Sequence, residues 1–435
     1  MTRTMKHILA GLLVSPALAL AQAPPAPAPV VPMPTAPPVA TLPPAVPPPA
    51  VALPEPPKAD EAKADDAKAD EPAAPKDKFL LEKLLAGSPA AQTLGKNGWT
   101  IYGWTQGSYN ASTASNSNLP VPFIDRANQF SLNQNWLHVE KAVDTSKKEY
   151  QWGMAADVIM PGTDYRTTVA RGMFDGQVRN GVLYGFDLFQ AYVDLFSPNV
   201  GPQGTIFRVG KFATHCEYEV VQGISNPFVS RSYLFQYNPF THTGVNAITQ
   251  LNDDWTVSNG AVLGNDNFID PAAQLTYIGQ VKWAPKNGKT SALFNVSVTN
   301  PRYNVAEAFA FYNVYNLQIT HKLTDKWTYA ADTTFSHMDN IPNVGSANWY
   351  GFVNYLFYDV TDKLQSKARV ELFEDSKGVR TGTAGLYTAV TYGLTWKPKP
   401  WLYIMPEVRY DYAQGRPFEG DHDLFTATIG AIVRW

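Results

Sequence analysis

The chain ends with the stretch Asp423-Leu424-Phe425-Thr426-Ala427-Thr428-Ile429-Gly430-Ala431-Ile432-Val433-Arg434-Trp435. Every second position from Phe425 to Trp435 is apolar, and most of the positions between are small or polar. A period of two with one apolar face is the pattern of a β-strand. A soluble β-protein could also end in such a strand, so the fold depends on whether the pattern recurs.

The composition favours a membrane setting over a soluble one. The chain has 435 residues, a formal net charge of −3 and 17% charged residues, whereas an average soluble protein has about 25%. Its 11 tryptophans and 22 tyrosines suit aromatic belts at two membrane interfaces. The charge offers no basic footprint for nucleic acid. The single cysteine, Cys216, excludes an intramolecular disulfide and a cysteine-cluster metal site.

The first 97 residues differ in composition and pattern from the rest. Residues 1–21 predict a secretory signal peptide, because Arg3 and Lys6 precede an apolar stretch that ends in Ala19-Leu20-Ala21. Residues 22–78, Pro/Ala-rich and then Lys/Asp/Ala-rich, predict a disordered linker, since proline removes backbone donors and fixes φ. A solvated spacer and a tether to cell-wall material both remain open for this linker. Residues 79–97 predict a short amphipathic helix before the main domain.

From residue 98 to residue 435 the alternating pattern recurs and predicts sixteen strands. Short turns such as Asn252-Asp253-Asp254 alternate with longer Gly-, Pro- and Asn-rich loops, among them 215–239 and 339–346. This order predicts an all-β fold: a transmembrane, antiparallel, up-and-down β-barrel of about sixteen strands with both termini periplasmic. The predicted strands are 98–109, 129–141, 149–160, 187–196, 204–214, 240–250, 254–264, 274–284, 290–300, 311–323, 326–338, 347–359, 363–374, 384–397, 401–412 and 423–435.

Charged residues share one face of several predicted strands. A Lys or Arg that faced lipid at the membrane midplane would cost about 2–4 kcal/mol, and a dry core would accept charges only in pairs. A sixteen-stranded barrel leaves a lumen wide enough for water, so we predict that these residues line a wet pore. In 187–196 we place Phe189 toward lipid and Asp194 toward the lumen. The predicted pore-lining residues are Asp194, Lys282, Asp332, Lys367, Arg369, Glu371, Glu407, Arg409 and Asp411.

The third long loop, 215–239, is rich in aromatic residues and carries Glu217, Glu219 and Arg231. One interpretation places it inside the lumen, where these three charges would form a constriction. The other makes it an external lid that packs on neighbouring loops. The sequence does not decide between them.

Several pieces of residues 98–435 resemble the OmpL-like β-barrel porins, a family common in Planctomycetes. The pieces are Gly103-Trp104-Thr105-Gln106-Gly107-Ser108-Tyr109, Asp125-Arg126-Ala127-Asn128, Gly162-Thr163-Asp164-Tyr165-Arg166, Glu217-Tyr218-Glu219-Val220-Val221, Pro239-Phe240-Thr241-His242-Thr243-Gly244 and Trp349-Tyr350-Gly351. The resemblance implies an outer-membrane barrel with porin function and transfers no catalytic residue. The aromatic end also resembles the last strand of bacterial outer-membrane barrels, which implies that Trp435 is a signal for the assembly machinery.

The predicted function is passive diffusion of small hydrophilic solutes through a porin in the outer membrane, with no cofactor, no metal and no enzyme activity. The expected partners are outer-membrane lipid, the assembly machinery and the solutes; homo-oligomer formation remains open. His215-Cys216-Glu217 lacks a second cluster at ligand spacing and is set aside as a metal site. The alternative is a structural or adhesive barrel whose lumen is plugged by loops, with the linker as a periplasmic tether. A barrel hydrolase is a third interpretation.

Overall fold

In the computed structural model, the described residues are 81, 88, 95, 97–269, 274–304 and 309–435. They all belong to one compact unit. The predicted signal peptide (1–21), the predicted linker (22–78) and most of the predicted helix (79–97) lie outside the described residues. Within the described part of the chain, no helix has the length and apolar character needed to cross a membrane.

The described chain is built almost entirely from strands, with a few one-turn helices in its loops. The strands are β1 (Trp99–Ser112), β2 (Gln129–Lys141), β3 (Gln151–Gly162), β4 (Gly185–Ser197), β5 (Thr205–Ala213), β6 (Thr241–Gln250), β7 (Trp255–Val262), β8 (Thr276–Trp283), β9 (Thr290–Val298), β10 (Asn313–Lys322), β11 (Trp327–Ile341), β12 (Gly345–Thr361), β13 (Leu364–Asp375), β14 (Gly385–Lys399), β15 (Leu402–Ala413) and β16 (Asp423–Arg434). The helical turns are η1 (Thr145–Lys147), α4 (Tyr165–Thr168), α5 (Gly176–Arg179) and α6 (Tyr233–Gln236).

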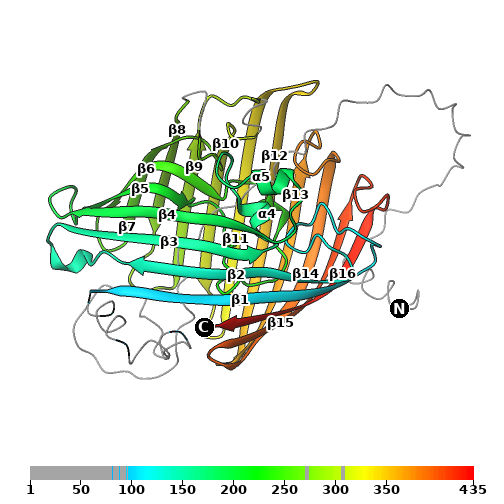
Figure 1. Ribbon diagram of the computed structural model, residues 1–435, viewed down its shortest axis with the longest axis horizontal. Helices are drawn as coiled ribbons and strands as arrows, with labels where there is room; N and C mark the ends of the chain where they lie inside the picture. The colour runs from blue at the N-terminus through cyan, green and yellow to red at the C-terminus, as the bar shows by residue number, and fades with distance from the viewer. Residues whose placement is uncertain (1–80, 82–87, 89–94, 96, 270–273, 305–308) are drawn as a thin grey trace, which may run out of the picture. The chain divides into compact units, whose positions relative to one another are not determined.

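These sixteen strands form a closed barrel in which each strand pairs with its sequence neighbours (Figure 1). The last strand, β16, pairs antiparallel with β1, with Tyr109 opposite Ile429. Two further hydrogen bonds extend this seam, because Trp435 and Gly103 exchange backbone N–H and C=O groups at 2.9 Å. The predicted fold class is therefore confirmed, and closure removes the unpaired edges that an open sheet would expose.

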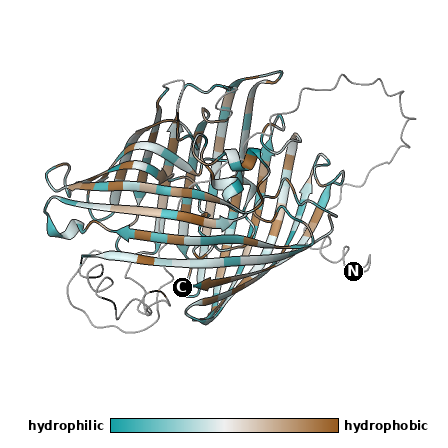
Figure 2. Cartoon of the chain, viewed as in Figure 1, coloured by the Kyte–Doolittle hydropathy of each residue, from teal (hydrophilic) through white to brown (hydrophobic). Residues whose placement is uncertain are grey.

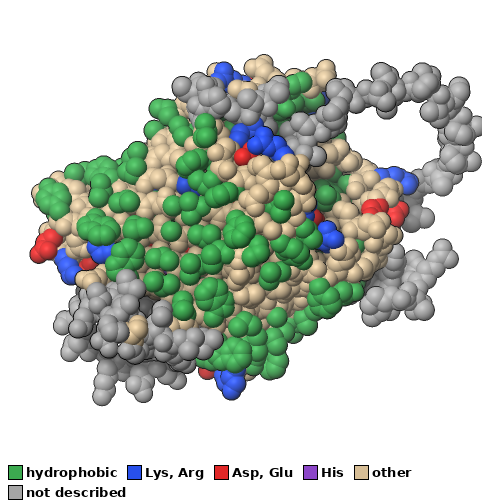
Figure 3. Space-filling model, viewed as in Figure 1, with side chains coloured by type: hydrophobic (Ala, Val, Ile, Leu, Met, Phe, Trp, Pro, Cys, Tyr) green, Lys and Arg blue, Asp and Glu red, His purple; other side chains and the backbone are tan. Residues whose placement is uncertain are grey.

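The two faces of the wall differ as the alternation predicts. On β13, Val370 and Leu372 are each 46% exposed on the outside, whereas Arg369 and Glu371 are at most 1% exposed inside. Figure 2 shows the hydrophobic and hydrophilic residues alternating along the strands. In Figure 3 hydrophobic side chains dominate the middle of the visible face, and most charged side chains lie toward its ends. This is the arrangement of a barrel with an apolar outer face and a polar interior.

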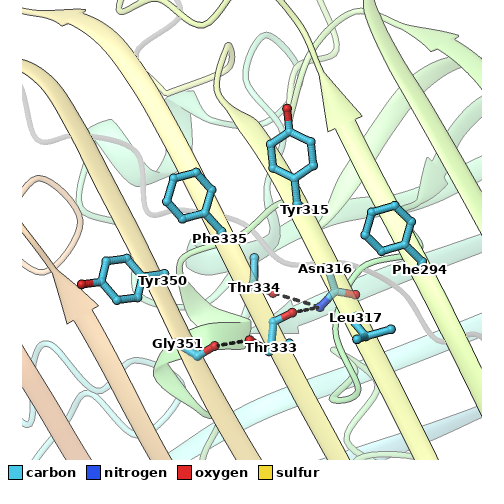
Figure 4. Close-up of a pocket in the computed structure, with 9 residues that line it drawn as sticks. All are labelled: Phe294, Tyr315, Asn316, Leu317, Thr333, Thr334, Phe335, Tyr350 and Gly351. Carbon is cyan, nitrogen blue, oxygen red and sulfur yellow. Dashed lines mark hydrogen bonds between the residues drawn. The ribbon is translucent and has the colours of Figure 1, made fainter.

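A close view of β9 to β12 shows how single residues follow this rule (Figure 4). The rings of Phe294, Tyr315 and Phe335 are 39–48% exposed on the outer surface, where they border a shallow hollow of about 320 Å³. Asn316, on the inner face, donates a hydrogen bond to Thr334 at 2.9 Å. The hollow therefore opens outward and is not part of the lumen.

Tryptophan gathers at one end of the barrel. Of the 11 tryptophans, six lie beside the short turns between strands, and two more, at the start of β1 and just after the end of β16, lie at the same end of the barrel. The remaining three, Trp104, Trp136 and Trp349, are buried inside. A belt of amphipathic rings at one level is typical of a membrane–water interface. The belt consists of Trp99, Trp152, Trp255, Trp283, Trp327, Trp396, Trp401 and Trp435.

Two local expectations are corrected by the structure. The predicted loop 339–346 is mostly strand: β11 and β12 continue to residues 341 and 345, and Asn340, Asn343 and Gly345 supply the positive φ values that a tight reversal needs. Phe189 does not face lipid. A register shift between β3 and β4 turns it inward, where it is fully buried 5.3 Å from the ring of Trp136.

Candidate functional site

The connection from β5 to β6, residues 214–240 and hereafter loop 3, lies against the inner wall of the barrel. On one side, Gln134 of β2 donates to the carbonyl of Val221 at 2.6 Å and accepts from the N–H of Gly223 at 3.0 Å. On another side, the N–H groups of Val229 and Ser230 donate to Glu407 of β15 at 2.7 and 2.9 Å. Loop 3 therefore folds into the lumen, as the first interpretation of 215–239 predicted, and is not an external lid.

An ion-pair ladder on β13 and β15 holds the middle of loop 3. Arg369 lies 2.5 Å from Glu219 of the loop and 3.3 Å from Glu371 on its own strand. Arg409 lies 2.9 Å from Glu371 and 2.7 Å from Asp411. These side chains are at most 1% exposed, so each charge depends on its partners rather than on water.

Backbone groups of loop 3 and the hydroxyl of Tyr233 complete the ladder. Glu371 accepts from the N–H of Tyr233 at 2.7 Å, and the Tyr233 hydroxyl donates to Asp411 at 2.8 Å. Lys367 donates to the carbonyl of Pro227. On the neighbouring strand, Gly430 of β16 leaves the room that the loop needs, because a Cβ there would lie 2.5 Å from Val229. Sequence spacing places these wall charges on one face, but only the fold places the loop over them.

Arg231, predicted as a constriction charge, is 1% exposed and bonded to the loop itself. Its guanidinium donates to four backbone carbonyls of loop 3, those of Val220, Val221, Phe228 and Val229, at 2.8–3.0 Å. Arginine suits this position because its planar fork offers five donors that never lose their charge at neutral pH. Arg231 therefore ties the two limbs of loop 3 together.

Two carboxylates anchor the beginning of loop 3. Asp332 of β11 accepts from the N–H of Tyr218 at 2.6 Å. Glu217 accepts from Asn238 and Thr334, each at 2.7 Å, and its backbone has a positive φ of 73°. Burial, together with the nearby charge of Asp332, raises the pKa of Glu217 well above its ordinary value of 4.5. A neutral, protonated Glu217 is the form that fits beside a second carboxylate.

The raised pKa of Glu217 predicts that loop 3 docks less tightly as the pH rises. Below the ordinary pKa the side chain is neutral whether the loop is docked or free. Above it the free loop loses the proton and the docked loop resists, so docking weakens by up to about 1.4 kcal/mol per pH unit until the raised pKa is reached. Cys216, the only cysteine and 2% exposed, reports the change through its rate of labelling by a polar maleimide.

Glu217→Gln tests this expectation, since the amide keeps the size of the group and cannot ionise. We divide the Cys216 labelling rate in the natural protein by that in the variant, because this ratio cancels the thiol's own titration. The ratio should rise with pH. Burial also raises the pKa of Asp164 and Asp266, so the variant retains part of the pH dependence. A ratio that stays constant across the range contradicts the assignment.

Seven of the nine predicted pore-lining residues contact loop 3, and two do not. The contacting residues are Asp332, Lys367, Arg369, Glu371, Glu407, Arg409 and Asp411. Asp194 of β4 instead pairs with Arg208 of β5 at 2.8 Å, and Lys282 of β8 faces the lumen without an ion pair to any described residue. We predict contact with a passing solute for these nine residues and for three loop 3 residues, Glu217, Glu219 and Arg231, and this stays a prediction.

Sequence reasoning missed a row of uncharged side chains on the inner wall. Gln280 of β8, Asn295 of β9 and Asn316 of β10 are cross-strand partners, and each amide donates to the next at 2.8 Å. The amide of Asn316 in turn donates to Asp332 of β11 at 2.7 Å. The same inward parity that singled out the charges would have identified these amides. A search restricted to charged residues overlooked them.

Among the described residues, no group of three or more His, Cys, Asp or Glu side chains is placed to hold a metal ion. Cys216 is buried and does not form a disulfide.

The fold and this interior define the class: a sixteen-stranded porin-type barrel with its third loop folded into the lumen. Residues 98–434 match the family described as "Putative beta-barrel porin-2, OmpL-like", and the chain belongs to that family. The fold is similar to three solved outer-membrane structures. They are an anion-selective porin from Comamonas acidovorans (TM-score 0.53, 9% identity, 78% of this chain and 99% of that one), the outer-membrane channel DcaP of Acinetobacter baumannii (0.52, 9%, 78% and 97%) and OprB of Pseudomonas putida (0.51, 12%, 80% and 96%). No curated protein sequence matches the chain.

Proposed function

We propose that the protein is an outer-membrane porin that lets small hydrophilic solutes diffuse passively through its lumen. The observation that carries the proposal is that charged side chains of the wall away from loop 3 have exposed surface. The side chains of Glu140 and Arg208 there are 39% and 20% exposed, unlike the fully buried ladder under the loop. A wet, charged path lowers the cost of moving a polar solute through hydrocarbon. The proposal gives no catalytic role to any residue.

The outward apolar face contacts outer-membrane lipid, the tryptophan belt lies at the periplasmic interface, and the amino-terminal linker extends into the periplasm after removal of the signal peptide. The assembly machinery recognises the terminal strand with Trp435. The linker can then reach cell-wall material.

Liposome swelling tests this function with uncharged solutes of increasing size. Vesicles that contain the folded protein should swell in isotonic arabinose and glucose, and the rate should fall as the sugar becomes larger. Swelling no faster than in protein-free vesicles contradicts the proposal.

A structural barrel is the second candidate, and one observation favours it. Arg369 and Arg409 have no exposed side-chain surface, so loop 3 fills the lumen beside them. If the rest of the lumen is filled as well, the barrel passes no solute. Silent vesicles that hold correctly folded, heat-modifiable protein would support this alternative.

A further inference from the structure

The connection from β13 to β14, residues 376–384, carries an arginine that the ion-pair ladder does not include. This connection lies at the end of the barrel opposite the tryptophan belt. Asp375, the last residue of β13, holds it in place, because its carboxylate accepts from the N–H groups of Val379, Arg380 and Thr381 at 3.1, 2.8 and 2.8 Å. The backbone of Arg380 is therefore fixed at the rim of the barrel.

The side chain of Arg380 lies over four aromatic rings. The central carbon of its guanidinium is 4.8 Å from the ring centre of Phe309, 5.0 Å from that of Trp349, 5.3 Å from that of Tyr312 and 5.9 Å from that of Tyr237. Trp349 is fully buried on β12, and its indole N–H donates to the carbonyl of Tyr237 in loop 3 at 3.0 Å. Arg380 therefore covers the place where the wall meets loop 3, and the rings hold its guanidinium there.

Two nitrogens of this guanidinium remain free. Arg380 is partly exposed, and within the described chain its side chain makes no hydrogen bond and no ion pair. Of its three nitrogens, only Nε is buried. Nη1 and Nη2 therefore have accessible surface at the rim, and both carry N–H groups that can donate to a solute.

The carboxyl groups nearest to Arg380 are occupied by other donors. Asp375 accepts a fourth hydrogen bond, from the hydroxyl of Thr381, at 3.0 Å. Asp266 lies close enough for the charge of Arg380 to act on it, but it accepts from the N–H groups of Phe240 and Thr241 at 2.8 and 2.7 Å. Neither acid offers the guanidinium an ion pair, so its accessible N–H groups have no acceptor among the residues that the structure describes.

The geometry of this group matches a carboxylate. A guanidinium fork offers two parallel N–H groups and one positive charge, and a carboxylate offers two coplanar oxygens and one negative charge. A phosphate dianion would leave one negative charge unmatched at a single arginine. The rings exclude water from one side of the fork and fix its position, so an anion on the open side meets a less screened and preorganised charge.

We propose that Arg380 is a capture site for small monocarboxylates at the mouth of the lumen opposite the tryptophan belt, in which Nη1 and Nη2 donate to the two carboxylate oxygens. The site rests on the proposed porin function and names a class of solute for it. A solute that enters from this end meets Arg380 where the wall joins loop 3.

The test uses the full chain folded in detergent, with benzoate as the probe because its ring protons are observed directly. Saturation-transfer difference NMR should give a saturable benzoate signal with the natural protein. Arg380→Gln should raise the half-saturating concentration roughly fivefold or more, because it removes both the charge and the fork. Arg380→Lys keeps the charge without the fork and should fall between the natural protein and Arg380→Gln.

Arg416→Gln is the matched control, because Arg416 lies on an exposed loop where its guanidinium approaches only the carbonyl of Gly420 at 3.4 Å. It should bind benzoate like the natural protein, and partition of benzoate into detergent is the same for every variant. At pH 8, acetate should displace benzoate at a lower concentration than inorganic phosphate does, and the reverse order contradicts the carboxylate class.

Labelling of Cys216 by a polar maleimide shows whether loop 3 stays docked when Arg380 is changed. The rate in Arg380→Lys should equal that in the natural protein, so that weaker benzoate binding there reports the lost fork. Faster labelling together with unchanged benzoate binding would overturn the site and make Arg380 a positioning residue for loop 3.

Planar bilayers separate the site from the porin function. Benzoate should reduce the chloride current of the natural protein in a saturable way, and it should do so more weakly in Arg380→Gln. Benzoate binding that is lost in Arg380→Gln and kept in Arg416→Gln supports the site even if no current flows, in which case only the porin function fails. Normal currents with equal benzoate binding in all variants overturn the site and leave the porin function standing.

Discussion

Replacing Arg369 by alanine is expected to release loop 3 from the wall and to raise the conductance of the barrel. Arg369 is bound to Glu219, Glu371, Ser230 and Thr391, and neither it nor Glu219 has exposed side-chain surface. Removal leaves Glu219 charged, buried and unpaired, which costs about 3–5 kcal/mol. That loss shifts the docking equilibrium by roughly a hundredfold or more.

Two measurements follow the release of the loop in this variant. Single-channel steps should become larger and noisier, and a polar maleimide should label Cys216 faster, since the thiol is buried while loop 3 is docked. Arg369→Lys keeps the charge with fewer hydrogen bonds. Its step size and its labelling rate should fall between those of the natural protein and those of Arg369→Ala. Arg416→Ala serves as the control, because the Arg416 guanidinium only approaches the carbonyl of Gly420 at 3.4 Å on an exposed loop. Unchanged steps and unchanged labelling in Arg369→Ala would show that the ladder does not hold the loop.

Deleting Trp435 is expected to impair insertion of the barrel and to leave pore chemistry unaltered. Trp435 extends the β1–β16 seam through two backbone hydrogen bonds to Gly103, and its indole N–H donates to Thr105 at 3.1 Å. Its ring lies directly over Gly103, where an added Cβ would come within 2.4 Å. The deletion removes these contacts and the terminal aromatic group at once, so we expect outer-membrane levels to fall roughly tenfold or more, given about 1 kcal/mol per lost hydrogen bond in addition to the lost ring contact.

The comparison is made by immunoblot of membrane fractions, with heat-modifiable mobility as the sign of folding. Trp435→Phe retains an aromatic end and should restore most of the folded protein, whereas Trp435→Ala keeps only the two backbone hydrogen bonds and should fall between Trp435→Phe and the deletion. The molecules that do insert should conduct like the natural protein. Normal outer-membrane levels of heat-modifiable protein in the deletion would contradict both the seam and the signal.

The strands could be predicted from the sequence because each is decided locally. In β13, Lys367, Arg369 and Glu371 alternate with Ala368 and Val370, and no tertiary contact is needed to see that two faces differ. The pairing of β16 with β1 follows from closure of an even number of strands. The bulge at Phe189 escaped prediction because one inserted residue reverses the parity of the neighbouring residues without any sign in composition.

The candidate site was predictable only in part. Inward parity identified Arg369 and Glu407, and loop length identified 215–239, but nothing local pairs Glu219 with Arg369, since they lie 150 positions apart. Arg231 was assigned to a constriction from its charge alone, whereas its four carbonyl partners are backbone groups that no sequence pattern marks. The solute-facing roles of these residues remain predictions that the variants above test.

Current through the natural protein in a planar bilayer tests the central claim most directly. The full chain, refolded in detergent and added to one chamber in potassium chloride, should insert in discrete steps of equal size. Each step should be ohmic over moderate voltages and should scale with salt concentration, as a water-filled lumen requires. Heat-modifiable, folded protein that inserts and remains silent at every salt concentration and voltage would contradict the claim that this barrel is a porin.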